Sequence, residues 1–156
     1  MSKIPWDGNT PPAGNARQHL PQLVADYFAF GRELLASHPQ PSELHALRLA
    51  TKRLRYTLEL FRPCYGPGLA LRIRELRELQ QLLGEINDTA AAARTLDGVL
   101  NGSPQRPRID SFLRREGESK AAAFHKQWRE VFDAPGQEHW WTSYLARRSR
   151  KPEGKA

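Results

Sequence analysis

The residues best suited to chemistry in this sequence lie in the segment 45–61, and the chemistry they suit is anion binding. Four basic or ionisable side chains recur there at intervals of three or four residues: His45, Arg48, Lys52 and Arg55. On a helix they share one face and span roughly 15 Å at ~1.5 Å per residue. Stacked like charges repel one another, and a linear polyanion lying along this basic ridge would offset the repulsion. The pattern alone leaves an ordinary solvated basic face as the alternative.

The same segment predicts the helix that carries the basic ridge. Its apolar residues recur at helical spacing and form a second stripe beside the ridge: Leu44, Leu47, Ala50, Leu54, Leu58 and Phe61. Tyr56 and Glu59 continue the basic side. Ser42 is a natural N-cap and Glu43 suits the positive end of the helix, whereas Pro63 favours an end just before it. The ridge should therefore lie beside a buried face.

Four further helices are predicted around this one. They are expected at about 16–37, 69–100 and 109–132, with a short closing helix at 138–145. Proline and glycine mark the connections, and residues 1–15 are expected to be an irregular or disordered lead-in. No β-alternation of useful length occurs. Short connections between amphipathic helices imply antiparallel neighbours, so we predict an all-α, antiparallel four-helix bundle with a short closing helix. Residues 147–156 are expected to be a basic flexible tail.

Two of these helices have inner faces that can be read from the sequence. The helix at 69–100 has an inner stripe of Leu69, Ile73, Leu76, Leu79, Leu83, Asn87 and Ala90. Asn87 would then need a polar partner in the core. Gly84 costs about 1 kcal/mol relative to alanine in a helix, which predicts the close approach of a neighbouring helix. For 109–132 the expected inner residues are Phe112, Leu113, Ala121, Phe124, Trp128 and Phe132.

Charge and composition favour an acidic partner. The 156-residue chain has a formal net charge of +7 and an isoelectric point near 10.0. Such a balance suits nucleic acid, polyphosphate or an anionic membrane surface, without choosing among them. No apolar run approaches membrane-spanning length, and the N-terminal residues lack a signal-peptide core. Cys64 is the single cysteine, so an intrachain disulfide is impossible. We expect a soluble cytoplasmic protein.

The sequence gives little support for catalysis or for a bound metal or cofactor. No glycine-rich phosphate loop follows a strand, and Cys64 lies beside Pro63 without an evident base. His45 is followed at i+3 and i+4 by Arg48 and Leu49, and the other histidines lie in different segments without metal-site spacing. The aromatic residues cluster near the end of the chain, which favours packing over base stacking. We expect neither an enzyme nor a metal site.

Two stretches of the sequence resemble the CHAD family, the conserved histidine α-helical domain. Residues 44–48, 52–56 and 59–61 resemble the histidine helix of that family, and residues 76–88 resemble the helix that follows it. Weaker similarity continues into 128–132 and 140–141. The resemblance extends over about 16–146, which we interpret as one CHAD-like helical domain.

The resemblance implies an all-helical fold that binds inorganic polyphosphate through basic residues in a groove, without catalysis. His45, Arg48, Lys52 and Arg55 match the phosphate-contacting positions of the family, and Arg77 matches a commonly basic one. With two neighbours on the same helix, the candidate polyphosphate-binding set is His45, Arg48, Lys52, Arg55, Arg53, Tyr56 and Arg77. Arg53 is expected to point further round the helix.

The chain departs from the family pattern in one respect. CHAD domains usually contain two such helical repeats that face a shared basic channel, whereas this sequence contains one, which resembles the C-terminal repeat. Either half a channel suffices or two chains supply the halves, and we expect a homodimer. The alternatives are a nucleic-acid-binding protein that uses the same ridge without base specificity, and a structural dimer of helices whose charge serves solubility.

Overall fold

A computed structural model describes residues 3–147 of the chain, and this part is built from helices. Five α-helices are present: α1 (Pro12–Ala36), α2 (His45–Phe61), α3 (Pro67–Val99), α4 (Arg106–Gln127) and α5 (Gln137–Arg147). Three short segments join them: η1 (Pro41–Leu44) and η2 (Arg62–Cys64), which are 3-10 turns, and η3 (Trp128–Phe132), which is a π-helical turn. Residues 3–147 contain no β-strand. The prediction of an all-α fold is confirmed.

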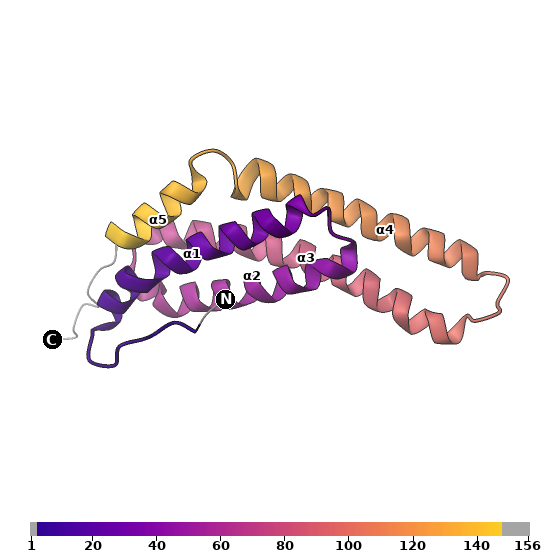
Figure 1. The fold of residues 1–156 in the computed structure, drawn as a ribbon, viewed down its shortest axis with the longest axis horizontal. Helices are drawn as coiled ribbons and strands as arrows, with labels where there is room; N and C mark the ends of the chain where they lie inside the picture. Colours follow the sequence, from indigo (N-terminus) through magenta and orange to yellow (C-terminus); the bar gives the residue numbers. More distant parts are fainter. Residues whose placement is uncertain (1–2, 148–156) are drawn as a thin grey trace.

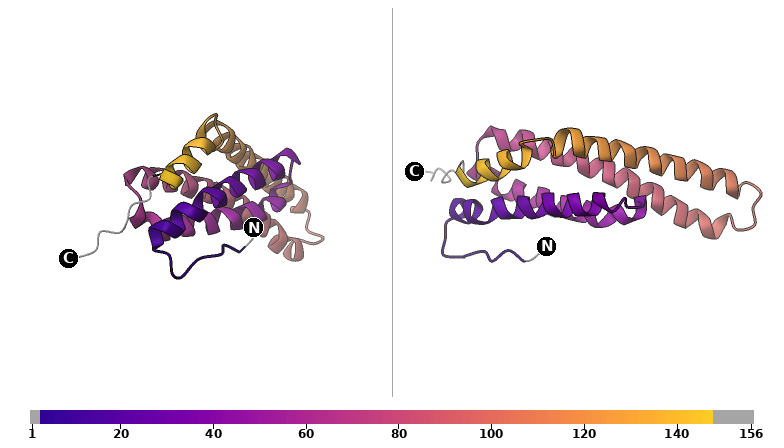
Figure 2. Two further views of the ribbon diagram at one scale, coloured as in Figure 1. Left: turned by 60° about the vertical axis from the view of Figure 1, so that its left-hand side comes forward. Right: turned by 45° about the horizontal axis from the view of Figure 1, so that its top comes forward.

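The helices form an elongated antiparallel bundle. Helix α1 packs against α2 and α5, while α3 packs against α2 and α4. Figure 1 shows α4 and α5 following one another along one side, so that together they serve as the fourth member of the bundle. The far ends of α3 and α4 extend beyond α1 and α2 as a two-helix arm, which is seen from two other directions in Figure 2. The arrangement agrees with the predicted bundle and its closing helix.

Aromatic side chains from α1 and η3 fill the centre of the core. The rings of Phe28 and Phe132 stack with their centroids 4.6 Å apart, and Tyr27 meets both Phe132 and Trp128 at 5.6 Å. Gly31 makes this packing possible, because a Cβ atom at that position would overlap the Trp128 indole. A single missing side chain on α1 therefore admits the largest side chain of η3.

One polar pair is buried between α1 and α2. The hydroxyl of Thr51 donates to the carbonyl oxygen of Leu47 at 2.8 Å, so Tyr27 donates its own hydroxyl to Thr51 at 2.7 Å. Both side chains are fully buried. The apolar stripe predicted for α2 did not include Thr51, although Leu47, Leu54 and Leu58 are buried as predicted. Burial raises the pKa of Tyr27 above its ordinary value, which keeps this hydroxyl protonated as a donor.

Helix α1 begins four residues earlier than predicted, because the side chain of Asn15 ties the lead-in to its first turn. The Asn15 amide donates to the carbonyl oxygens of Asp7 and Thr10 at 2.7 and 3.0 Å, and its oxygen accepts from the Asp7 backbone at 3.0 Å. Pro12 occupies the first turn, where the missing N–H has no helical partner to lose. Residues 12–15, expected to belong to the lead-in, are helical.

The start of α2 also differs from the prediction. Ser42 was expected to be its N-cap, but Gln40 and Glu43 form a capping box around η1 instead, with the Gln40 N–H donating to the Glu43 carboxylate at 2.5 Å. Helix α2 then begins at His45. This places His45 in the first turn of α2, where the helix dipole favours a negative charge.

Two inner-face assignments on α3 and α4 were wrong. Ile86 is buried on α3, whereas Asn87 turns to a half-exposed position. Phe112 is 55% exposed, because the arm that carries it packs helix to helix with no third layer to cover it. The basic tail predicted for 147–156 lies outside the described residues, apart from Arg147 at the end of α5.

Candidate functional site

A polar groove runs between α2 and α3. It encloses about 380 Å³ and is lined by Arg48, Arg55, Arg77, Gln80, Gln81 and Gly84. The two helices run antiparallel, so the start of α2 lies beside the later part of α3 and the end of α2 lies beside its earlier part. Three guanidinium groups therefore share one cleft, and we refer to it below as the α2–α3 groove.

Arg48 lies across Gly84 in the middle of the groove. The nearest heavy atom to a Cβ built on Gly84 is Nε of Arg48, at 4.0 Å, and not an atom of a neighbouring helix backbone. The prediction that Gly84 admits a close helix was therefore wrong. Among residues 3–147, no hydrogen-bond acceptor reaches this buried Nε atom. A buried donor without a partner carries a free-energy cost that a bound anion would remove.

Arg55 and Arg77 meet a carboxylate at one end of the groove. The Oε1 atom of Glu59 accepts from Nη1 of Arg55 at 2.8 Å and from Nη2 of Arg77 at 2.7 Å. Arg55 also donates its Nε–H to Gln80 at 2.7 Å. Burial alone would raise the pKa of Glu59, but the two guanidinium groups outweigh it and hold this pKa below its ordinary value. Glu59 is thus ionised at neutral pH.

His45 and Asn87 extend the groove at its other end. Nδ1 of His45 lies 3.0 Å from Oδ1 of Asn87, which joins the first turn of α2 to α3. His45 is one turn from Arg48 on α2, and Asn87 is one turn from Gly84 on α3. Asn87 thus finds its polar partner in this histidine rather than in the core.

Lys52 and Tyr56 lie on the solvent-facing side of α2, at the edge of the groove. The Tyr56 ring is 4.4 Å from the Arg55 guanidinium carbon and 5.7 Å from the Lys52 ammonium nitrogen. Both contacts fall within the range of cation–π attraction. The exposed ring therefore holds two cations at the edge of the groove.

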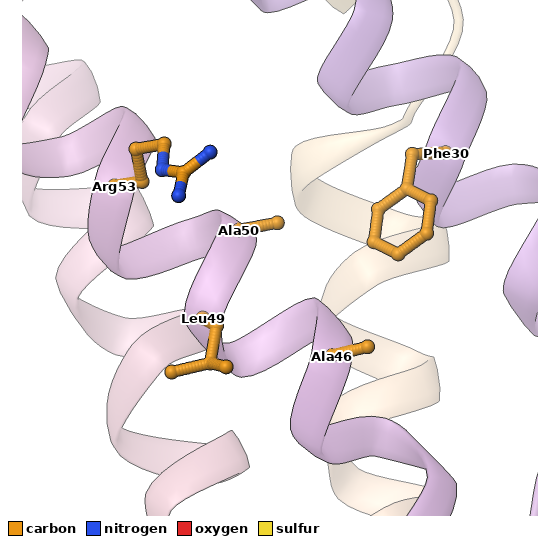
Figure 3. Close-up of a pocket in the computed structure, with 5 residues that line it drawn as sticks. All are labelled: Phe30, Ala46, Leu49, Ala50 and Arg53. Atoms are coloured by element: carbon orange, nitrogen blue, oxygen red, sulfur yellow. The ribbon is translucent and has the colours of Figure 1, made fainter. Parts of the chain in front are cut away.

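Arg53 is separated from the other candidate residues. Figure 3 shows it beside a shallow hollow of about 180 Å³ between α1 and α2, which is lined by Phe30, Ala46, Leu49, Ala50 and Arg53. It lies two residues from Arg55, which is about 200° around a helix. The structure thus brings together His45, Arg48, Lys52, Arg55, Tyr56 and Arg77, and not Arg53.

Sequence reasoning missed most of the contribution of α3 to the groove. Gln80, Gln81 and Gly84 were not proposed as site residues, and neither was Asn87. Together with Arg77 they recur at intervals of three or four residues on the face of α3 beside its buried stripe. That helical spacing could have identified these residues of α3 as part of the site.

The described residues show little other site chemistry. Within residues 3–147, no three side chains of histidine, cysteine, aspartate and glutamate gather as a metal site requires. Burial raises the pKa of the Cys64 thiol, which disfavours its nucleophilic thiolate form. No helix in this part of the chain combines the length and the apolar character needed to cross a bilayer.

The comparison with known families agrees with the two motif helices. The family model described as the CHAD domain matches residues 5–97, which is more than half of the 156-residue chain. The matched region contains α1, α2 and nearly all of α3, and hence both walls of the α2–α3 groove. The weaker similarities at 128–132 and 140–141 lie outside it. No curated protein and no solved structure matches the chain. The chain belongs to the CHAD domain family.

Proposed function

We propose that the α2–α3 groove binds inorganic polyphosphate, and that the protein acts as a binding or targeting module without catalytic activity. The CHAD domain is associated with polyphosphate binding. The observation that carries the proposal is the Arg48 side chain, whose buried Nε atom has no acceptor among residues 3–147. Phosphate oxygens are strong acceptors for a guanidinium fork, so a rotation of the Arg48 side chain toward an anion in this groove would satisfy that donor.

Each side chain of the groove then has a distinct role. Arg48 binds phosphate at the centre, and Arg55 and Arg77 attract it at the end nearer Glu59. His45 lies at the opposite end, where the positive end of the α2 dipole adds to the attraction. Lys52 supplies a positive charge at the edge of the groove. The groove and ridge are open along their length, which suits a linear polyanion better than a small globular anion.

Nucleic acid is the second candidate ligand. Tyr56 favours it, because an exposed aromatic ring beside cations can stack on a base without sequence preference. Its ring already contacts Arg55 and Lys52, which leaves less of its surface for a base. Polyphosphate therefore remains the first proposal.

A homodimer is part of the same proposal. Leu49, Tyr56 and Leu60 are 49%, 50% and 75% exposed on the outer face of α2. With Arg53 they occur at intervals of four, three and four residues, which reads the same in both directions. Two α2 helices packed antiparallel about a two-fold axis would place Leu49 of each chain against Leu60 of the other. The axis would lie in the interface plane, so both grooves would fall on one face of the dimer.

A competition assay at fixed salt tests the function. Long-chain polyphosphate should displace single-stranded and duplex nucleic acid from the protein, and Arg48→Ala should weaken its binding. The matched control is Arg108→Ala on α4, which removes the same charge outside the groove. An equal loss of polyphosphate affinity in both variants would show that only net charge matters, and it would contradict binding in the α2–α3 groove. Nucleic acid that displaces polyphosphate would favour the second candidate.

A further inference from the structure

One anionic side chain already occupies part of the cationic groove. A single oxygen of Glu59 accepts hydrogen bonds from Arg55 at 2.8 Å and from Arg77 at 2.7 Å, so two of the three groove arginines are engaged by the protein itself. The third, Arg48, has no acceptor at its Nε atom among the described residues. Among residues 3–147, the groove therefore holds one arginine without an acceptor at Nε and two arginines that share the Glu59 carboxylate.

The occupied position has the geometry of a phosphate contact. One oxygen held by two guanidinium groups from different helices is an arrangement that a phosphoryl oxygen can adopt equally well. The Glu59 side chain is 26% exposed, so its carboxylate can swing outward into solvent, and a phosphate oxygen that takes its place would keep the less exposed Arg55 guanidinium paired. Two carboxylates of the facing helix α3 pair outside the groove: Glu75 with Arg72, and Glu85 with Lys120. Glu59 differs from them in pairing across the groove.

We propose that Glu59 is an internal competitor for polyphosphate, and that it makes the groove select long chains over short ones. This inference rests on the proposed function. Displacing Glu59 costs the same for every ligand, but a chain already anchored at Arg48 presents its next phosphates at a high effective concentration. A long chain can therefore take the Arg55–Arg77 position, whereas a short one remains at Arg48.

Glu59→Gln tests the proposal, because glutamine keeps the shape and an acceptor oxygen but removes the charge. Calorimetry at fixed salt should show tighter binding of both tripolyphosphate and long-chain polyphosphate. The gain in affinity should be larger for tripolyphosphate, at about tenfold. The ratio of the affinity for long-chain polyphosphate to that for tripolyphosphate should therefore fall. The salt dependence of tripolyphosphate binding should steepen by about 0.7 for one added phosphate contact. Glu75→Gln is the matched control and should reproduce neither change.

A second variant keeps the test decisive if Glu59→Gln unfolds. Arg77→Ala should weaken long-chain polyphosphate binding more than tripolyphosphate binding, because the short ligand does not contact this position in the native protein. Unchanged or weaker tripolyphosphate binding by folded Glu59→Gln would overturn the inference, as would equal losses for both ligands in Arg77→Ala. Unaltered long-chain binding by Arg48→Ala would instead overturn the proposed function, so the two failures are distinguishable.

Discussion

The imidazole of His45 is hydrogen-bonded through Nδ1 to the amide oxygen of Asn87, 3.0 Å away on the neighbouring helix. An amide oxygen can only accept, so Nδ1 carries the proton and the neutral ring presents an unprotonated Nε2. An anion requires a donor. His45 can therefore donate a hydrogen bond from Nε2 to a phosphate chain only when both ring nitrogens carry a proton.

Polyphosphate binding should accordingly be coupled to proton uptake. Titration calorimetry in two buffers with different ionisation enthalpies measures this uptake, which should disappear in His45→Gln. Equal proton uptake by the wild type and His45→Gln would show that a group other than His45 is protonated on binding.

The salt dependence of binding should report how many phosphates the site neutralises. If about five are contacted, log K should fall against log salt with a slope of roughly −3.5, at ~0.7 per contact as for single strands. Arg48→Ala should flatten this slope by about 0.7. Its melting temperature should not fall, because the Nε atom of Arg48 donates to no acceptor among residues 3–147. An unaltered slope would exclude Arg48 from the contacts.

Two glycine-to-alanine substitutions should change stability in opposite directions. Gly84→Ala should raise the free energy of unfolding by about 1 kcal/mol, because its new methyl group meets Arg48 at an ordinary 4.0 Å and gains helix propensity. Gly31→Ala should lower it by about 1–3 kcal/mol, since the methyl would overlap Trp128. Urea unfolding of both variants gives the comparison. Stabilisation by Gly31→Ala would contradict the packing described for η3.

The buried Tyr27–Thr51 pair should behave as a coupled unit. Thr51→Val leaves the Tyr27 hydroxyl unsatisfied in the core and should cost about 1–3 kcal/mol. Tyr27→Phe should cost less, because Thr51 still donates to Leu47. The double variant should cost less than the sum of the two, as urea unfolding of all four proteins would show. Simple additivity would exclude the hydrogen bond.

Acid should destabilise the protein partly through Glu59. Its pKa is lower in the folded state than in the unfolded chain, so its contribution is complete above the unfolded-state pKa. That contribution is lost as the pH falls through the folded-state pKa. Glu59→Gln should therefore lose less stability than the wild type on acidification from pH ~5 downward. Urea unfolding of the wild type and Glu59→Gln across this pH range tests the prediction. Identical pH profiles of the unfolding free energy would contradict the lowered pKa of Glu59.

Helical periodicity was sufficient to predict the two stripes of α2, because both depend on spacing within one element. Residues 45, 48, 52 and 55 share a face in any helix, and Leu47, Leu54 and Leu58 share another. The pairing of Glu59 with Arg77 joins two helices, and no spacing within α2 reveals it. Asn15 was missed as a helix anchor for the same reason, since its partners lie in the lead-in. The exposure of Phe112 depends on how far α1 and α2 extend beside the arm, which residue types do not specify.

The π-helical turn η3 sets the rotational phase between two parts of the chain. The N–H of Asp133 donates to the carbonyl oxygen of Trp128 five residues earlier, at 2.7 Å, so this turn holds one residue more than an α-helical turn. Deleting that residue would leave a regular helix with good hydrogen bonds. It would also rotate the end of the turn by about 100° relative to α4, and the buried Phe132 ring would turn away from Phe28, against which it stacks. A local irregularity in hydrogen bonding thus keeps the Phe132 ring in the core.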